Sequence, residues 1–173
     1  MSVTDTMTAR NANLSDLHAL LEAQQAAKLD VVVPARDLTV VGGNVQVLGA
    51  GEPVLTPDGV SLGQVSLRPT SHADANLAAK LDIPVKYLRR LRDQHIGLYD
   101  ESLNTLLGED PDYRFLVRGL VDPGTEAGIG RAFLSSSYRV TDNLDVLITV
   151  LEGIRAAGVP VRITQCDQSE TRM

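Results

Sequence analysis

Hydrophobic positions recur at helical spacing in some parts of the chain and in an extended, strand-like pattern in others. The changes between these patterns mark the predicted elements. From Leu14 to Leu21 leucines recur at helical spacing, with Asn13 or Ser15 available as the N-cap. This pattern predicts a helix over residues 15–28. Residues 1–13 show no periodicity, and we expect a flexible tail there.

An extended pattern follows between residues 35 and 68, after Pro34 has prevented the helix from continuing. Gly42 and Gly43 separate two short apolar runs, and glycine tolerates the positive φ that a tight hairpin turn requires. Residues 57–59, Pro-Asp-Gly, form a second turn signal. Together these turns predict a small antiparallel meander.

Two short helices are predicted next. Ser71 is a candidate cap for a helix over residues 71–80, and Pro84 suits the first turn of a second helix over residues 85–94. Residues 101–107 predict a further short helix. The buried stripe of the second helix is expected to consist of Tyr87, Leu88 and Leu91.

The last third of the chain predicts paired strands over residues 115–121 and 131–138, then an amphipathic helix that Asp142 or Asn143 caps and Gly158 ends. Its expected apolar face is Leu144, Leu147, Ile148, Leu151 and Ile154.

Residues 159–166 predict a strand, and residues 171–173 look like the start of a return strand. We therefore expect a chain that is truncated at its C-terminus or that completes its sheet with a partner. The predicted fold is a single α+β domain over residues 14–173, with a small antiparallel sheet and several short helices.

Composition narrows the function classes. The 173 residues are 43% hydrophobic and 22% charged, as in ordinary globular domains. Only 3% are aromatic, which leaves few rings for stacking on bases. A single cysteine, Cys166, excludes an internal disulfide and a cysteine-based zinc site. No apolar run approaches the ~20 residues that span a bilayer, and with a single cysteine we expect a location in a reducing cytoplasm.

The net charge of −6 argues against nucleic-acid binding by bulk charge, but the charge is uneven. Residues 80–92 hold five basic residues and one acid. This excess is either a binding face or a solvated helix surface. The basic residues expected on the outer face of the second helix are Lys86, Arg89, Arg90 and Arg92.

Four arginines on or beside the predicted strands extend this candidate surface. The planar fork of arginine donates two hydrogen bonds to phosphate, so a nucleic-acid backbone is a suitable ligand. The alternative is that they pair with nearby acids, such as Asp112 and Asp122. These arginines are Arg114, Arg118, Arg131 and Arg139.

Two segments carry a family resemblance: Leu-Ala-Ala-Lys-Leu-Asp-Ile-Pro-Val-Lys-Tyr-Leu at residues 77–88, and Arg-Ala-Phe-Leu-Ser-Ser-Ser-Tyr-Arg-Val-Thr-Asp-Asn at residues 131–143. Because these segments occur in this order, residues 65–173 resemble the phage and plasmid family known as domain of unknown function number 932. The resemblance implies a bacterial mobile element and a longer C-terminus, and it transfers no catalytic residues because the activity of that family is not established.

Other interpretations have less support. The helical pair is close to a helix–turn–helix, but Val85 and Tyr87 suit the reading end of such a motif poorly, and a meander precedes it. The coarse order of elements is also that of single-strand annealing proteins, which is a likeness of fold alone. Residues 124–131 lack the Gly-Lys-Ser/Thr ending of a phosphate-binding loop, and the histidines lack metal-ligand spacing.

Two functions remain open from the sequence. The first is a non-enzymatic accessory factor of phage or plasmid replication or recombination, which binds single-stranded or double-stranded DNA and requires no cofactor. The second is an assembly module that forms a homo-oligomer through its sheet edges and binds no nucleic acid.

Overall fold

A computed structural model describes residues 9–122, 124–158 and 160–168, and it confirms the α+β class. Within the chain, the contacts between residues form two compact units. The larger unit is Lys28–Tyr138. The smaller unit combines the described residues up to Ala27 with those from Arg139 onward.

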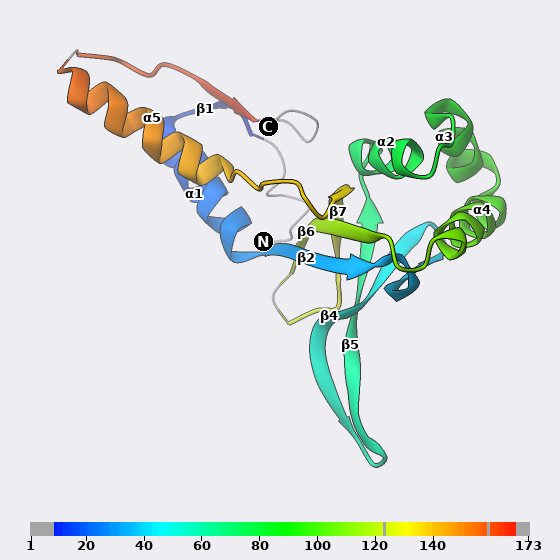
Figure 1. Ribbon diagram of the computed structural model, residues 1–173. Helices are drawn as coiled ribbons and strands as arrows, with labels where there is room; N and C mark the ends of the chain where they lie inside the picture. The colour runs from blue at the N-terminus through cyan, green and yellow to red at the C-terminus, as the bar shows by residue number, and fades with distance from the viewer. Residues whose placement is uncertain (1–8, 123, 159, 169–173) are drawn as a thin grey trace. The chain divides into compact units, whose positions relative to one another are not determined.

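The larger unit is built on a six-stranded sheet (Figure 1). This sheet is larger than the predicted meander and is mixed, because β5 and β7 pair in parallel while all the other neighbours are antiparallel. The strands lie in the order β2 (Lys28–Pro34), β6 (Arg114–Val121), β7 (Ala127–Ser135), β5 (Gly59–Pro69), β4 (Asn44–Thr56) and β3 (Leu38–Val41).

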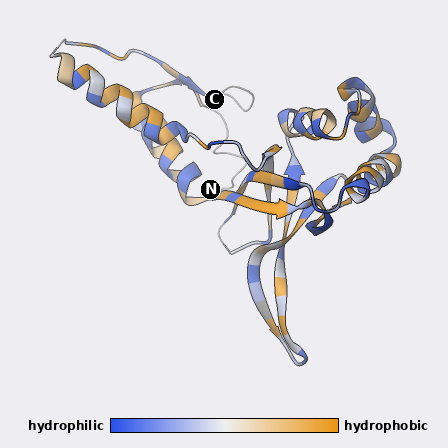
Figure 2. Cartoon of the chain, in the orientation of Figure 1, coloured by the Kyte–Doolittle hydropathy of each residue, from blue (hydrophilic) through white to orange (hydrophobic). Residues whose placement is uncertain are grey.

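Strand β2 was missed by the sequence analysis, which treated Pro34 only as the end of a helical region. Its Leu-Asp-Val-Val-Val run is largely hydrophobic (Figure 2) and pairs with β6 along its whole length, from Lys28 opposite Leu120 to Pro34 opposite Arg114. Pro34 is tolerated because it is the last residue of a strand at the edge of the sheet.

Both predicted hairpins are confirmed. Gly42 and Gly43 have φ angles of 58° and 78° and connect β3 to β4. Such positive φ values at both turn positions match the twist of the flanking strands. Pro57 and Asp58 connect β4 to β5, where the Thr56 hydroxyl donates to the carbonyl of Gly59 at 3.0 Å.

Three helices, α2 (Ser71–Lys80), α3 (Val85–Gln94) and α4 (Ile96–Glu109), gather on one side of the sheet (Figure 1). The N-cap of α2 is Thr70 rather than the expected Ser71, since the Thr70 hydroxyl accepts from the backbone N–H of Ala73 at 3.2 Å. Leu88 and Leu91 are buried as predicted, but Tyr87 is 53% exposed.

The edge of β3 is closed by α4. The side chain of Asn104 accepts from the backbone N–H of Val40 at 2.7 Å and donates to the carbonyl of the same residue at 2.8 Å. The Asp100 carboxylate accepts from the N–H groups of Gly42 and Gly43, at 2.6 and 2.9 Å. These contacts satisfy edge groups that would otherwise be free to pair with another strand.

The hydrophobic core lies between the sheet and the three helices. Phe115, Val117 and Phe133 from the sheet pack in one buried cluster with Leu77, Leu88 and Leu103 from the helices. All residues of this cluster lie between Val33 and Phe133, inside the larger unit. The core is mainly aliphatic, which follows from the low aromatic content.

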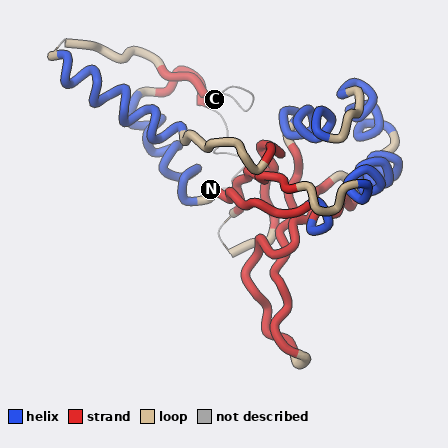
Figure 3. Tube along the Cα trace, in the orientation of Figure 1, coloured by secondary structure: helices blue, strands red, loops and turns tan. Residues whose placement is uncertain are grey.

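The smaller unit contains helix α1 (Leu14–Ala26), helix α5 (Asn143–Ala157) and a two-stranded antiparallel sheet of β1 (Ala9–Ala12) and β8 (Cys166–Gln168), all shown by type in Figure 3. The caps Asn13 and Gly158 are confirmed, the latter with φ of 65°.

Three expectations for this unit require correction. Residues 9–12, placed in the flexible tail, form β1, because they pair with β8. The strand predicted over residues 159–166 is absent from described residues 160–165 and is found instead at Cys166–Gln168. The apolar face of α5 is only half-buried, and Ile148 is exposed. The predicted return strand at residues 171–173 lies outside the described residues.

None of the helices in the described part of the chain combines the length and the apolar composition that a bilayer crossing requires.

Candidate nucleic-acid interface

The exposed basic face of α3 is formed by Lys86, Arg89 and Arg90, and we call it the α3 face. These positions are spaced i, i+3 and i+4, so the three side chains project from one side of the helix. All three are exposed, and within the described residues none forms an ion pair with a carboxylate. One acid of the helix, Asp93, is also exposed and lies one turn further along.

Local hydrogen bonds hold two of these side chains near the helix surface. Arg89 Nη2 donates to the carbonyl of Ser71 at 3.3 Å, and Arg90 Nε donates to Gln94 Oε1 at 3.2 Å. Each guanidinium therefore keeps further N–H donors for a ligand, because an arginine has five.

Arg92 does not belong to the α3 face, contrary to the prediction. Its side chain is 20% exposed and forms an ion pair with Asp74 of α2, with 3.0 Å between Nε and Oδ2. It also donates to the carbonyls of Pro69 at 3.0 Å and Gly43 at 2.7 Å. Arg92 thus connects α3 to α2, to the end of β5 and to the β3–β4 turn, and it cannot reach a ligand without breaking these contacts.

Tyr99 of α4 completes this buried network. Its hydroxyl donates to Asp74 Oδ1 at 2.7 Å and accepts from Arg92 Nη2 at 2.8 Å. Burial raises the pKa of Asp74, while the hydrogen bond from Tyr99 and the charge of Arg92 oppose that rise. Burial and the neighbouring Asp74 carboxylate raise the pKa of Tyr99 above its ordinary value. The phenol therefore stays protonated as a hydrogen-bond donor, which suits a structural role.

Arg118 is also removed from the predicted surface. It is 5% exposed, and it pairs with both carboxylate oxygens of Asp30 in the neighbouring strand β2, at 2.9 and 3.2 Å. Residues 30 and 118 lie directly opposite each other in the β2–β6 ladder. A buried, two-point ion pair holds the strands in register and leaves no fork for phosphate.

The remaining predicted arginines lie on elements other than α3. Arg114 is exposed at the start of β6, and Arg131 is half-buried in β7. Arg139 belongs to the smaller unit. Of the eight residues predicted from the sequence, the structure brings Lys86, Arg89 and Arg90 together.

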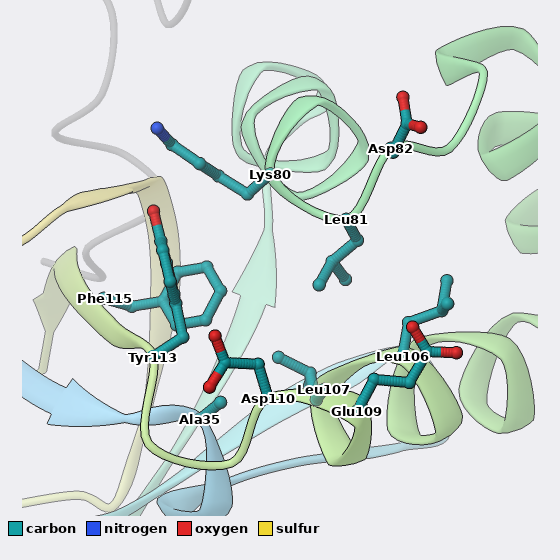
Figure 4. A pocket seen from close by; sticks show the side chains of 10 residues that line it. All are labelled: Ala35, Lys80, Leu81, Asp82, Leu106, Leu107, Glu109, Asp110, Tyr113 and Phe115. Atoms are coloured by element: carbon teal, nitrogen blue, oxygen red, sulfur yellow. The ribbon is translucent and has the colours of Figure 1, made fainter.

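A cavity of about 260 Å³ lies beside the last residues of α2 and α4 (Figure 4). Leu81 points into this space, and Tyr113 stands against Phe115 with their ring centroids 4.8 Å apart. The charged residues at the cavity are Lys80, Asp82, Glu109 and Asp110. Because the carboxylates outnumber the single lysine, the cavity repels phosphate and does not extend the α3 face.

Within residues 9–122, 124–158 and 160–168, no three His, Cys, Asp or Glu side chains gather closely enough to hold a metal ion.

The network of Asp74, Arg92 and Tyr99 was not predicted from the sequence. A weak signal was present, since Asp74 precedes Leu77 and Ala78 by three and four residues and so shares the inward side of α2. A buried acid on such a side requires a basic or hydrogen-bonding partner. The pattern alone did not indicate which of the nearby cations was that partner.

Comparison of the chain with protein-family models, with curated proteins and with solved structures gave no match.

Proposed function

We propose that this protein is a non-enzymatic nucleic-acid-binding accessory factor, and that it contacts the phosphate backbone through the α3 face. Following the sequence resemblance, we place it in a phage or plasmid that replicates or recombines in the cytoplasm of a bacterial host. The observation that carries the proposal is that Lys86, Arg89 and Arg90 lie exposed on one side of a short helix, without a carboxylate partner in the described chain.

Phosphate is the ligand that this arrangement favours. Two guanidinium groups with free donors and one ammonium group present fixed positive charge, and a backbone contact requires nothing more specific. The burial of Arg92 and Arg118 in ion pairs supports this interpretation, because these two arginines serve the fold, whereas among the described residues those of the α3 face form no ion pair with a carboxylate.

The net charge of −6 limits the strength of this binding. With three phosphates neutralised, the logarithm of the affinity falls with that of salt by a slope of about −2.7 for duplex and about −2.1 for single strands. A rise from about 50 to about 200 mM salt then weakens binding about 40-fold for duplex and about 20-fold for single strands.

Fluorescence anisotropy of labelled oligonucleotides, single- and double-stranded, tests the proposal at these two salt concentrations. Arg89→Glu/Arg90→Glu is expected to abolish binding. The matched control is Arg155→Glu/Arg162→Glu, which reverses two exposed arginines of the smaller unit and lowers the net charge equally. Binding that is absent at low salt, or that both variants lose equally, would exclude the α3 face as the interface.

The preference between strands also distinguishes two modes of action. A preference for single strands indicates annealing, and a preference for duplex indicates groove or backbone docking of the α2–α3 pair. A helix–turn–helix requires a third packing helix, and the sequence predicted none before the pair. Helix α4, which follows the pair in the chain, packs against α3 and can serve as that third helix.

The alternative function, an assembly module, is favoured by one observation. Strand β2 is an outer strand of the sheet, and β6 is its one partner among the described strands. The edge of β2 that faces away from β6 offers backbone groups to a second chain. Under this alternative the protein forms an oligomer that added DNA does not alter.

A further inference from the structure

The β4–β5 hairpin extends beyond the rest of the sheet as an arm of residues 52–62 (Figures 1 and 3). Strands β3 and β7 pair only with the inner parts of β4 and β5, so the arm consists of two strands that pair only with each other. Register shifts between Leu48 and Gly51 and between Gly51 and Val54 mark its base.

The base of the arm is closely packed backbone. A Cβ added at Gly63 would lie 2.1 Å from the carbonyl oxygen of Glu52, so no side chain fits there. Bulges together with such a glycine redirect a hairpin, and they indicate that the direction of the arm is built into the fold.

One face of the arm is apolar and uncovered. Leu55 lies opposite Val60 in the ladder, and Leu62 follows Val60 by two residues, so all three side chains share that face. They are 84%, 67% and 65% exposed. A two-stranded hairpin is marginally stable in water, so a partner that covers this face would also stabilise the arm.

The charge of the arm selects the chemistry of that partner. Glu52 and Asp58 are both exposed, and residues 49–63 contain no lysine or arginine. An acidic arm repels nucleic acid and attracts a basic surface that also offers apolar contact. The α3 face has this chemistry, because Tyr87, 53% exposed, follows Lys86 and precedes Arg89 on the same helix.

We infer that the arm of one copy docks on the α3 face of a second copy, and that nucleic acid competes with the arm for this face. Within one copy the tip of the arm and α3 lie far apart (Figure 1), so the contact joins two molecules. Because the two surfaces differ, the contact closes either as a two-fold dimer, in which each arm docks on the other copy, or as a head-to-tail ring or chain of subunits. The competition rests on the proposed function, whereas the docking does not.

Sedimentation velocity of the full chain, over a range of protein concentrations without nucleic acid, tests the docking. Wild-type protein is expected to self-associate reversibly, and Val60→Ser/Leu62→Ser to raise the dissociation constant about tenfold or more, because two apolar contacts are lost. The matched control is Val161→Ser/Ile163→Ser, which changes two exposed aliphatic residues outside the arm, the α3 face and β2, and it is expected to leave the dissociation constant unchanged. A monomeric wild type, or equal association of the arm variant, overturns the inference.

A charge exchange between the two surfaces tests the pairing itself. Glu52→Lys/Asp58→Lys and Arg89→Glu/Arg90→Glu are each expected to weaken self-association, and a mixture of the two variants to restore it, because the exchanged charges attract again. Circular dichroism verifies that both variants are folded. Failure of the mixture to associate more strongly than either variant alone overturns the assignment of α3 as the docking face.

Anisotropy with the same oligonucleotides separates this inference from the proposed function. The Val60→Ser/Leu62→Ser variant keeps the α3 face intact, and it is expected to bind more tightly than wild type because no arm competes. If oligonucleotides bind no variant while the charge exchange restores association, the proposed function fails and the docking stands. If oligonucleotides bind wild type and the arm variant equally, the competition is overturned.

Discussion

Arg89 and Arg92 lie three residues apart on α3 and have opposite surroundings. Arg89 is exposed and makes one hydrogen bond to a backbone carbonyl, whereas Arg92 donates to two carbonyls and to Tyr99 and pairs with the buried Asp74. Sequence spacing assigned both to the outer face. The difference depends on Asp74, eighteen residues before Arg92 in another helix, and a helical periodicity does not contain that information.

This contrast leads to a prediction about stability. Arg92→Ala leaves Asp74 buried without its cation, and we expect the free energy of unfolding to fall by about 2–4 kcal/mol, since Arg92 is partly exposed and breaking a fully buried pair costs about 3–5 kcal/mol. Arg89→Ala, the same substitution on the same helix, is expected to change it by less than about 0.5 kcal/mol. Urea unfolding followed by circular dichroism measures both, and equal losses would contradict the structural role of Arg92.

At the scale of elements, α4 acts as a cover for the edge of β3. Asn104 replaces a neighbouring strand by bonding to both backbone groups of Val40. Asp100 does the same at the turn, where it binds two successive N–H groups. The sheet therefore has one edge closed by side chains, and the opposite edge, β2, has β6 as its single described partner.

Asn104→Ala tests this cover. The substitution leaves an N–H and a carbonyl of β3 without their partners, and we expect a loss of about 1–3 kcal/mol in the free energy of unfolding. Thr105→Ala, at an exposed position of the same helix, is the control and is expected to stay within about 0.5 kcal/mol of wild type. If Asn104→Ala lowers the free energy of unfolding by less than about 0.5 kcal/mol, water replaces the lost amide and the covering role of α4 is contradicted.

The sequence predicted elements that depend on neighbouring residues and missed those that depend on distant ones. Both hairpins were found because their turns carry Gly42-Gly43 and Pro57-Asp58, whose backbone preferences act locally. Strand β2 was missed because its partner, β6, lies far along the chain, with Asp30 bonded to a residue 88 positions away. The basic helix α3 was predicted correctly. Its exposed residues were not, because the burial of Arg92 depends on contacts with other elements.

At the scale of the whole molecule, the buried residues are unevenly divided. The main cluster lies entirely in the larger unit, and in the described part of the smaller unit Leu21 is the one buried hydrophobic residue. Helix α5 has no buried residue over its length. The larger unit therefore has a core of its own, whereas the described part of the smaller unit has none.

We expect the excised segment Lys28–Tyr138 to fold alone, because it retains the whole cluster. Its urea unfolding should be a single cooperative transition, with a lower free energy of unfolding than that of the full chain. If the full chain unfolds cooperatively and the excised segment shows no transition, the smaller unit is required for folding.

The parallel pairing of β5 with β7 also has a consequence for synthesis on the ribosome. About 60 residues separate the end of β5 from the start of β7, and they include all three helices and β6. At about 5–20 residues per second, the edge of β5 waits about 3–12 s for its partner after it leaves the exit tunnel. During that interval the nascent chain offers the meander, arm included, to any neighbouring strand, so the rate of translation through α2–α4 sets how long the protein is exposed to mispairing.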